Sequence, residues 1–214
     1  MVMWERPAGP AGGNGGCVGG VMDDGRHEPK YNDRMGIGRK DRTVIVHMDG
    51  TGMPQAWRGR ERPTMVTVRR ATVDDIDALV PLRLALLREA GEAAVGGEVA
   101  DATRTYLRDT LPTGEFVAWV AEAEGRVVST SGMVLFHRPP SWTNASGREA
   151  YVMNMYTEPA WRGQGLATAL LGEIIAFVRA TDARRIWLHA TPAGRPVYEK
   201  AGFVAHHGEM ELTW

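Results

Sequence analysis

The feature of this chain that most constrains its fold is one continuous stretch in which an extended segment leads through a glycine-containing turn into an amphipathic helix. Residues 150–157 are expected to form the strand, and residues 165–180 the helix. The helix repeats its apolar side chains at the α-helical spacing, as Leu166, Leu170, Ile174 and Phe177. These side chains predict one buried helix face in a core that the strand also borders.

The turn between this strand and this helix has the chemistry of an anion site. Backbone N–H groups at a helix start have no partner within the helix, and the helix dipole adds partial positive charge there. Gly163 and Gly165 lack a Cβ atom, so a phosphate can approach the main chain closely. Arg162 adds a positive charge beside the turn. The residues therefore predict binding of a phosphate or pyrophosphate group.

The turn does not match either of two well-known nucleotide-binding motifs. A P-loop requires a lysine followed by serine or threonine after its second glycine, and no lysine follows here. A dinucleotide fingerprint requires a third glycine, but Thr168 stands at that position. That fingerprint also belongs to an early βαβ unit, whereas this turn lies in the last third of the chain. Both interpretations are excluded.

The remaining pattern predicts a single α/β (α+β) domain built around one sheet. Thr72 and Asp75 are typical of a helix-opening cap, and Pro81 lies inside the helix that follows. Residues 124–126 are a hairpin turn, and residues 137–147 are a loop. Further strands are expected at 65–69, 116–123, 127–136, 185–190, 203–206 and 209–213, and further helices at 76–87, 98–111 and 193–201.

The composition changes near residue 65. Residues 1–64 hold 13 of the 26 glycines. A segment so rich in glycine has too few apolar side chains to bury, so burial cannot offset the entropy lost on ordering. We expect residues 1–64 to be a Gly-rich, mostly disordered extension in which only 43–48 forms a short strand. Residues 65–214 are expected to form the functional domain, and Met65 immediately precedes its first patterned segment.

Charge and cysteine content exclude several classes. The formal net charge is −1, so no strong field favours nucleic acid or an anionic membrane. Cys17 is the only cysteine, which excludes an internal disulfide and argues against a cysteine zinc site. No stretch approaches 18 apolar residues, and the N-terminus has no secretory apolar region. These features favour a cytoplasmic protein with no membrane or nucleic-acid partner.

Two sequence blocks carry a resemblance to a known family. The run Arg-Gly-Gln-Gly-Leu-Ala at 162–167, preceded by Thr-Glu-Pro at 157–159, resembles the cofactor-binding motif of the GNAT superfamily of N-acetyltransferases. The run Ile-Trp-Leu-His-Ala-Thr at 186–191, followed by Tyr-Glu-Lys-Ala-Gly-Phe at 198–203, is similar to that family's second block. The two blocks stand in the family's order, and the resemblance covers about 150 residues, a whole domain in length.

The resemblance implies a fold, a co-substrate and site residues. The fold is a mixed, mostly antiparallel sheet with flanking helices, in which the middle strands splay apart at a bulge. The co-substrate is acetyl-CoA, and the family's pyrophosphate contacts map onto the motif. The strand before the turn pairs with the pantetheine arm, and an N–H group polarises the thioester carbonyl. The pyrophosphate contacts fall on Arg162, Gly163, Gln164, Gly165, Leu166 and Ala167. The contacts with pantetheine and the thioester fall on Met155, Tyr156 and Thr157.

Proton transfer needs an acid and a base. The resemblance assigns protonation of the departing CoA thiolate to Tyr198, although a tyrosine packed in the core would look the same. Glu149 opens the central strand and is a candidate base, and His189 is a second; each has an ordinary structural alternative. Trp142 is a candidate for lining the acceptor pocket. Adjacent histidines at 206 and 207 would point to opposite faces of a strand, so no metal site is predicted.

One departure from the family pattern concerns the cofactor. Many relatives carry an asparagine after the second strand, where this chain reads Ala190-Thr191-Pro192. Side-chain capture of the cofactor at this point is therefore in doubt.

The sequence predicts an acetyl-CoA-dependent N-acetyltransferase that moves an acetyl group to a primary amine by direct attack on the thioester. The alternative is an inactive acyl-CoA-binding or regulatory domain of the same fold. The acceptor, a small molecule or a peptide amine, is not specified by the sequence because fold does not determine substrate. The resemblance also leaves a homodimer open.

Overall fold

The computed structural model describes residues 41–47, 63–92 and 95–206. In this part of the chain one six-stranded sheet runs in the order β1-β2-β3-β4-β5-β6. All neighbouring strands are antiparallel except β5 and β6, which are parallel. The strands are β1 (Arg42–His47), β2 (Pro63–Arg70), β3 (Phe116–Ala123), β4 (Arg126–His137), β5 (Arg148–Thr157) and β6 (Arg185–Trp187). The expected mixed, mostly antiparallel sheet is confirmed.

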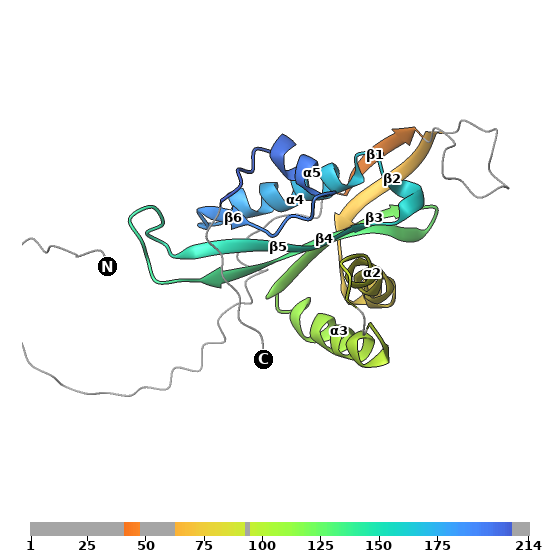
Figure 1. The fold of residues 1–214 in the computed structure, drawn as a ribbon, viewed down its shortest axis with the longest axis horizontal. Helices are drawn as coiled ribbons and strands as arrows, with labels where there is room; N and C mark the ends of the chain where they lie inside the picture. The colour runs from red at the N-terminus through yellow and green to blue at the C-terminus, as the bar shows by residue number, and fades with distance from the viewer. Residues whose placement is uncertain (1–40, 48–62, 93–94, 207–214) are drawn as a thin grey trace, which may run out of the picture.

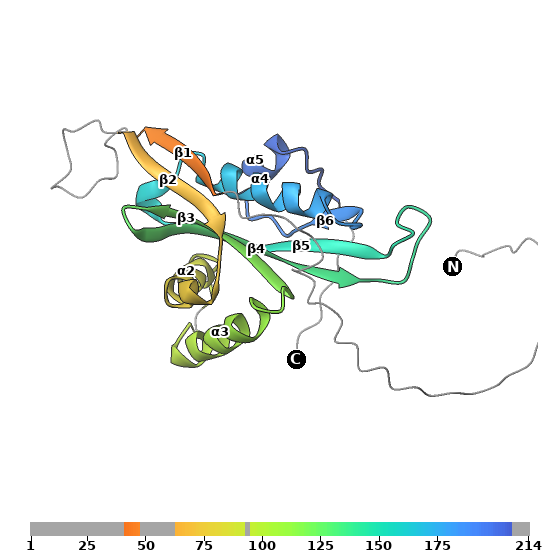
Figure 2. The same ribbon diagram turned by 180° about the vertical axis from the view of Figure 1, so that it is seen from behind.

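Helices cover both faces of the sheet (Figures 1 and 2). The helices α2 (Ile76–Glu89) and α3 (Gly97–Thr110) lie against one face, and α4 (Leu166–Arg179) lies against the other, next to the short α5 (Arg195–Lys200). Two apolar clusters result. One buries the predicted face of α4 against β2 to β5, and the other buries α2 and α3 against β3. No helix in the described residues is long and apolar enough to cross a membrane.

The predicted cap before α2 is present. The Thr72 hydroxyl accepts from the Asp74 N–H, and the Asp75 carboxylate accepts from the Thr72 N–H, while residues 73–75 form a 3₁₀ turn. Arg69 of β2 joins Asp75 through two hydrogen bonds of 2.7 and 2.9 Å. Burial alone would raise the pKa of Asp75, but the hydrogen bonds from Arg69 and Thr72 hold it below its usual value. This network fixes α2 to the sheet.

The sheet begins upstream of Met65. The predicted strand at 43–48 is present as β1, which pairs with β2 from Arg42 opposite Val68 to His47 opposite Pro63. The sheet thus includes residues that the sequence assigned to the extension. The disorder expected for the rest of 1–64 lies outside the described residues.

The C-terminal elements are shorter than predicted. β6 ends at Trp187, α5 begins at Arg195 with Pro196 in its first turn, and Phe203–His206 is not a strand. A strand needs a hydrogen-bonded neighbour, and β6 stops pairing with β5 after Trp187. Propensity alone cannot reveal that missing neighbour. The strand predicted at 209–213 lies outside the described residues.

Candidate active site

A bulge interrupts β5 at its centre. Met153 pairs with Gly132 of β4 and Tyr156 pairs with Thr130, so two residues of β5 oppose one of β4. Asn154 occupies this bulge with a φ of 56°, in the left-handed region that few non-glycine residues adopt. A bulge bends its strand and redirects its side chains, and such strain is often found at functional sites.

The two parallel strands separate beyond the start of β5. They pair from Glu149 opposite Arg185 to Tyr151 opposite Trp187, over three residue pairs. β5 then continues to Thr157 without a partner strand on that side among the described residues. The sheet is therefore splayed between β5 and β6, and the edge of β5 is left open just before the glycine turn.

The glycine turn presents bare main chain at the start of α4. Gly163 and Gly165 have φ values of 78° and 80°, and Gly165 is the N-cap with no side-chain hydrogen bond to the helix. A Cβ atom added to either glycine would meet no atom within 4 Å. Trp161 and Leu166 are both buried and anchor the turn on either side. The turn therefore exposes main chain at the start of a helix, where anions commonly bind, and the anion site stays a prediction.

Arg162 is directed away from this turn. Its Nη2 donates to both carboxylate oxygens of Glu89, at 2.7 and 2.8 Å, and its Nε donates to the Thr157 carbonyl at 2.9 Å. The Tyr156 hydroxyl donates to the same Glu89 carboxylate at 3.1 Å. Arg162 thus ties the turn to the end of α2, and Glu89 neutralises its charge.

The other predicted cofactor residues offer mainly their main chain. Leu166 is buried, and Ala167 has no polar side-chain atom. The Gln164 amide donates to the Ala160 carbonyl at 3.3 Å. Thr157 shares a 2.7 Å hydrogen bond with Ser129, and Met155 is half-buried. What these positions can give a ligand is therefore chiefly backbone N–H and C=O groups.

Tyr198 lies in α5 and is 8% exposed. Its ring meets Phe203 edge-on, with centroids 6.0 Å apart. Burial raises the pKa of Tyr198, and the nearby Tyr151 adds to the effect. The hydroxyl therefore keeps its proton at neutral pH, as an acid requires.

The two candidate bases have different surroundings. Glu149 is 6% exposed, and its carboxylate lies 3.4 Å from Arg138 and 3.6 Å from Arg185. His189 is exposed, and its Nδ1 lies 2.7 Å from the Tyr151 hydroxyl. Sequence reasoning considered His189 but missed this pairing with Tyr151. Trp142 is fully exposed on the β4–β5 loop and is not among the residues that line the pocket described below.

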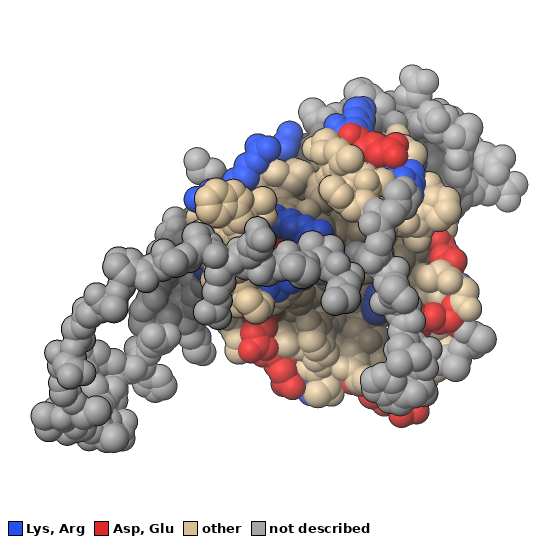
Figure 3. Space-filling model, turned by 60° about the vertical axis from the view of Figure 1, so that its left-hand side comes forward, with Lys and Arg blue, Asp and Glu red and all other residues tan. Residues whose placement is uncertain are grey.

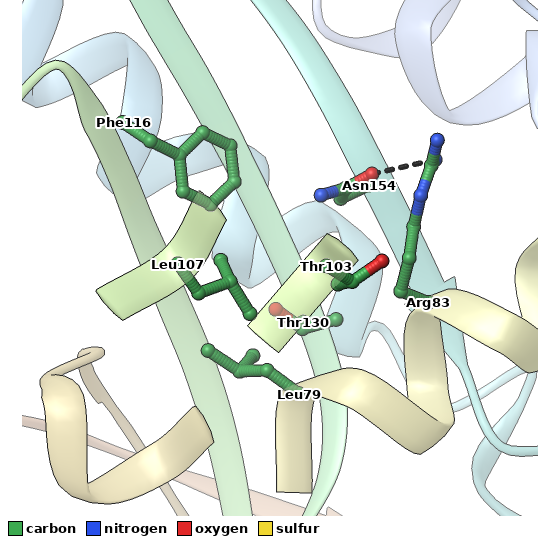
Figure 4. A pocket seen from close by; sticks show the side chains of 7 residues that line it. All are labelled: Leu79, Arg83, Thr103, Leu107, Phe116, Thr130 and Asn154. Carbon is green, nitrogen blue, oxygen red and sulfur yellow. Dashed lines mark hydrogen bonds between the residues drawn. The ribbon is translucent and has the colours of Figure 1, made fainter. Parts of the chain in front are cut away.

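Sequence reasoning also missed a pocket beside the bulge (Figure 4). The pocket encloses about 270 Å³, counting its open mouth, between α2, α3 and three strands. Its lining residues are Leu79, Arg83, Thr103, Leu107, Phe116, Thr130 and Asn154. A possible signal was Arg83, a charge within the apolar run Pro-Leu-Arg-Leu-Ala-Leu-Leu at 81–87.

Charges on the face in Figure 3 are mixed. Basic and acidic side chains both occur there among uncharged ones. This surface agrees with a formal net charge of −1.

The site thus combines a splayed sheet, a bulged strand and a glycine turn that opens a helix. Residues 85–203 match the sequence model of the Acetyltransferase (GNAT) family, and the chain belongs to that family. A predicted acetyltransferase from Clostridium acetobutylicum, solved with acetyl-CoA, superposes with a TM-score of 0.65 at 33% identity. The match covers 70% of this chain and 96% of that one.

Curated relatives share the central part of the chain. Glucosamine 6-phosphate N-acetyltransferase of Trypanosoma brucei brucei is 27% identical over 88 residues, which are 41% of this chain and 58% of that protein. N-acetyltransferase 8 of Rattus norvegicus is 33% identical over 82 residues, which are 38% of this chain and 33% of that protein. The chain therefore matches only 58% and 33% of the lengths of these two relatives.

Proposed function

We propose that this protein is an acetyl-CoA-dependent N-acetyltransferase that moves an acetyl group to the primary amine of an acceptor. The observation that carries the proposal is one strand with two consecutive binding features. The open edge of β5 leads directly into the glycine turn at the start of α4. The first feature suits the amide groups of pantetheine, and the second suits a pyrophosphate.

The main chain supplies most of the binding. N–H groups of residues 163–167 receive the pyrophosphate, with no Cβ atom in the way at Gly163 or Gly165. The edge of β5 at 155–157 pairs with the pantetheine arm, and one N–H group there donates to the thioester carbonyl. Losing one such donor typically costs about 10²–10³ in rate. Arg162 acts by holding the turn against Glu89 rather than by direct charge.

The reaction is a direct transfer. The amine nitrogen attacks the thioester carbon and forms the new C–N bond, and the resulting oxyanion is held by the N–H donor of β5. The C–S bond then breaks, and the CoA thiolate takes the proton of the Tyr198 hydroxyl, which solvent restores. The place of Tyr198 in the second sequence block supports this role, and its hydroxyl is protonated at neutral pH, although the raised pKa makes it a weaker acid than a free tyrosine.

A base must take the proton that the amine loses. Glu149 is already engaged by two arginines, whereas His189 is exposed next to Tyr151. The Tyr151–His189 pair therefore has the better access to solvent and to an entering amine.

We propose the cytoplasm as the location of the protein, because a chain with a single cysteine suits a reducing compartment.

Calorimetry with acetyl-CoA, followed by release of free thiol with a panel of primary amines, tests the proposal. We expect binding of acetyl-CoA and thiol release with at least one amine. Binding without transfer to any amine would instead support an acyl-CoA-binding regulatory domain. Absence of acetyl-CoA binding would overturn both functions.

A further inference from the structure

The pocket beside the bulge is lined by hydrogen-bond donors and contains one charge. Arg83 extends from α2 toward β5, and its Nη1 donates to the Asn154 Oδ1 at 2.7 Å (Figure 4). Thr103 adds a hydroxyl group, whereas the Thr130 hydroxyl donates to the Trp119 carbonyl at 3.2 Å. No aspartate or glutamate is among the lining residues. The site therefore offers a cation and several donors, but no anionic acceptor.

Three arginines near α2 are paired with carboxylates, whereas among the described residues Arg83 is not. Arg69 binds Asp75 and Glu122, Arg104 binds Asp77 and Asp101, and Arg162 binds Glu89. The hydrogen bond of Arg83 goes to a neutral amide, and no described carboxylate forms an ion pair with it. A guanidinium has five N–H donors, so most of the donors of Arg83 are not used by Asn154.

The apolar walls of the pocket strengthen the attraction between the Arg83 guanidinium and an anion. Leu79, Leu107 and Phe116 are all at most 5% exposed and form its apolar side. Electrostatic attraction grows as local polarity falls, and a half-buried guanidinium suits a carboxylate or phosphate, which it can bind through two parallel hydrogen bonds. The pocket is thus built to receive an oxyanion.

Its position fits an acceptor rather than the cofactor. Asn154 immediately precedes residues 155–157, the stretch proposed to hold the thioester, whereas the glycine turn follows that stretch. The pocket is far smaller than a site that encloses a whole ligand, so it can receive only a single small group at one end of the acceptor.

We infer that the acceptor is a small amine that carries a carboxylate or phosphate group, and that Arg83 binds this oxyanion while Asn154 holds the guanidinium in place. The inference rests on the proposed function and narrows its substrate class. Arg83 determines specificity in this account and takes no part in the bond-making steps.

Pairs of acceptors that differ only in the anion provide the test. Amino acids are compared with their amides, and glucosamine 6-phosphate with glucosamine, by thiol release at saturating acetyl-CoA. We expect kcat/KM to favour the anionic member of at least one pair. Arg83→Gln should reduce that preference about 10- to 100-fold, as expected for loss of a charged hydrogen-bonded pair. Arg83→Lys should retain part of it.

Arg104→Gln is the matched control, because it removes an arginine of the same helix layer that does not line the pocket. It should leave the preference unchanged. Equal use of anionic and neutral amines by the unmodified protein would overturn the inference while leaving N-acetyl transfer intact. Weaker acetyl-CoA binding by Arg83→Gln, with an unchanged ratio between paired acceptors, would assign Arg83 to the cofactor instead. Failure of every amine would point to the proposed function itself.

Discussion

The glycine turn and the pocket beside the bulge are built by opposite means along the same strand. The turn presents main-chain groups from one continuous segment, and its nearest charged side chain, Arg162, points away toward Glu89. The pocket is made of side chains from α2, α3, β3, β4 and β5. Most side-chain replacements can therefore alter the pocket while leaving the turn intact. The turn is sensitive mainly to what replaces its glycines.

The largest effect is expected from a bulky residue in the turn. Gly165→Val places a branched side chain in the open space assigned to the pyrophosphate, and it should weaken acetyl-CoA binding on the order of 100-fold, because more than one charged hydrogen bond is lost. Calorimetry measures the change in Kd.

The left-handed φ of Gly165 adds a backbone cost that needs a control. Gly125→Val provides it, because Gly125 has a φ of 76°, has nothing within 4 Å of an added Cβ atom, and lies in the β3–β4 turn. Both variants should lose similar stability, and only Gly165→Val should lose affinity. Equal affinities for the two variants would remove the turn from the binding site.

A smaller effect, on turnover rather than on binding, is expected from a change at Tyr198, which lies in neither the glycine turn nor the pocket. Tyr198→Phe removes one hydroxyl and keeps the ring against Phe203, so binding at both regions should persist. General acid catalysis typically contributes about 10²–10⁴, and because a thiolate is a fair leaving group we expect a fall of about 10- to 100-fold in kcat. Unchanged turnover would make water the acid. A loss of several kcal/mol in unfolding free energy would indicate a structural tyrosine instead.

A change in the pocket alone should give a still smaller effect. Asn154→Gly retains the left-handed backbone of the bulge and removes the acceptor that holds Arg83. Arg83 keeps its charge and loses only the hydrogen bond that positions it, so kcat/KM for an anionic acceptor should fall about 5-fold. The Kd for acetyl-CoA should stay constant. A change in that Kd would show that pocket and turn are not independent.

The smallest effect is expected from shortening the chain. A chain that starts at Met65 loses the edge strand β1 and the first two residues of β2, and keeps the rest of β2 and all of β3 to β6. We expect cooperative unfolding with a midpoint a few degrees lower, since about 1 kcal/mol shifts Tm by roughly 2–4 °C in a domain of this size. A chain that starts at Asp41 keeps β1 and should match the full chain. Insolubility of both would show that residues before 41 take part in folding.

The sequence predicted the region made of consecutive residues, the glycine turn, better than the pocket, which is assembled from distant residues. The strand, the glycine turn and α4 lie in consecutive residues, so their periodicity and turn residues were enough to anticipate them. The block around Tyr198 was recognisable for the same reason. The roles of individual residues in both blocks remain predictions until variants are measured.

The remainder depended on contacts between distant residues. Arg162 finds its carboxylate partner in Glu89, 73 residues away, and nothing beside Arg162 in the sequence indicates that pairing. The pocket joins five elements, and the bulge at Asn154 has no local signature in Met-Asn-Met. The strand predicted at 203–206 was wrong because strand formation requires a neighbour, which local propensity does not register.

The separation of β5 from β6 also has a consequence for the energetics of the whole domain. Beyond Tyr151 the sheet is incomplete, and the strand pairing that joins the C-terminal segment to β5 extends over only three residue pairs. A ligand seated in this opening would act as the missing strand and cross-link the two halves. By mass action, ligand at 100 times its Kd adds about 2.7 kcal/mol to the stability of a protein. The resistance of this enzyme to unfolding would then rise and fall with the supply of acetyl-CoA around it.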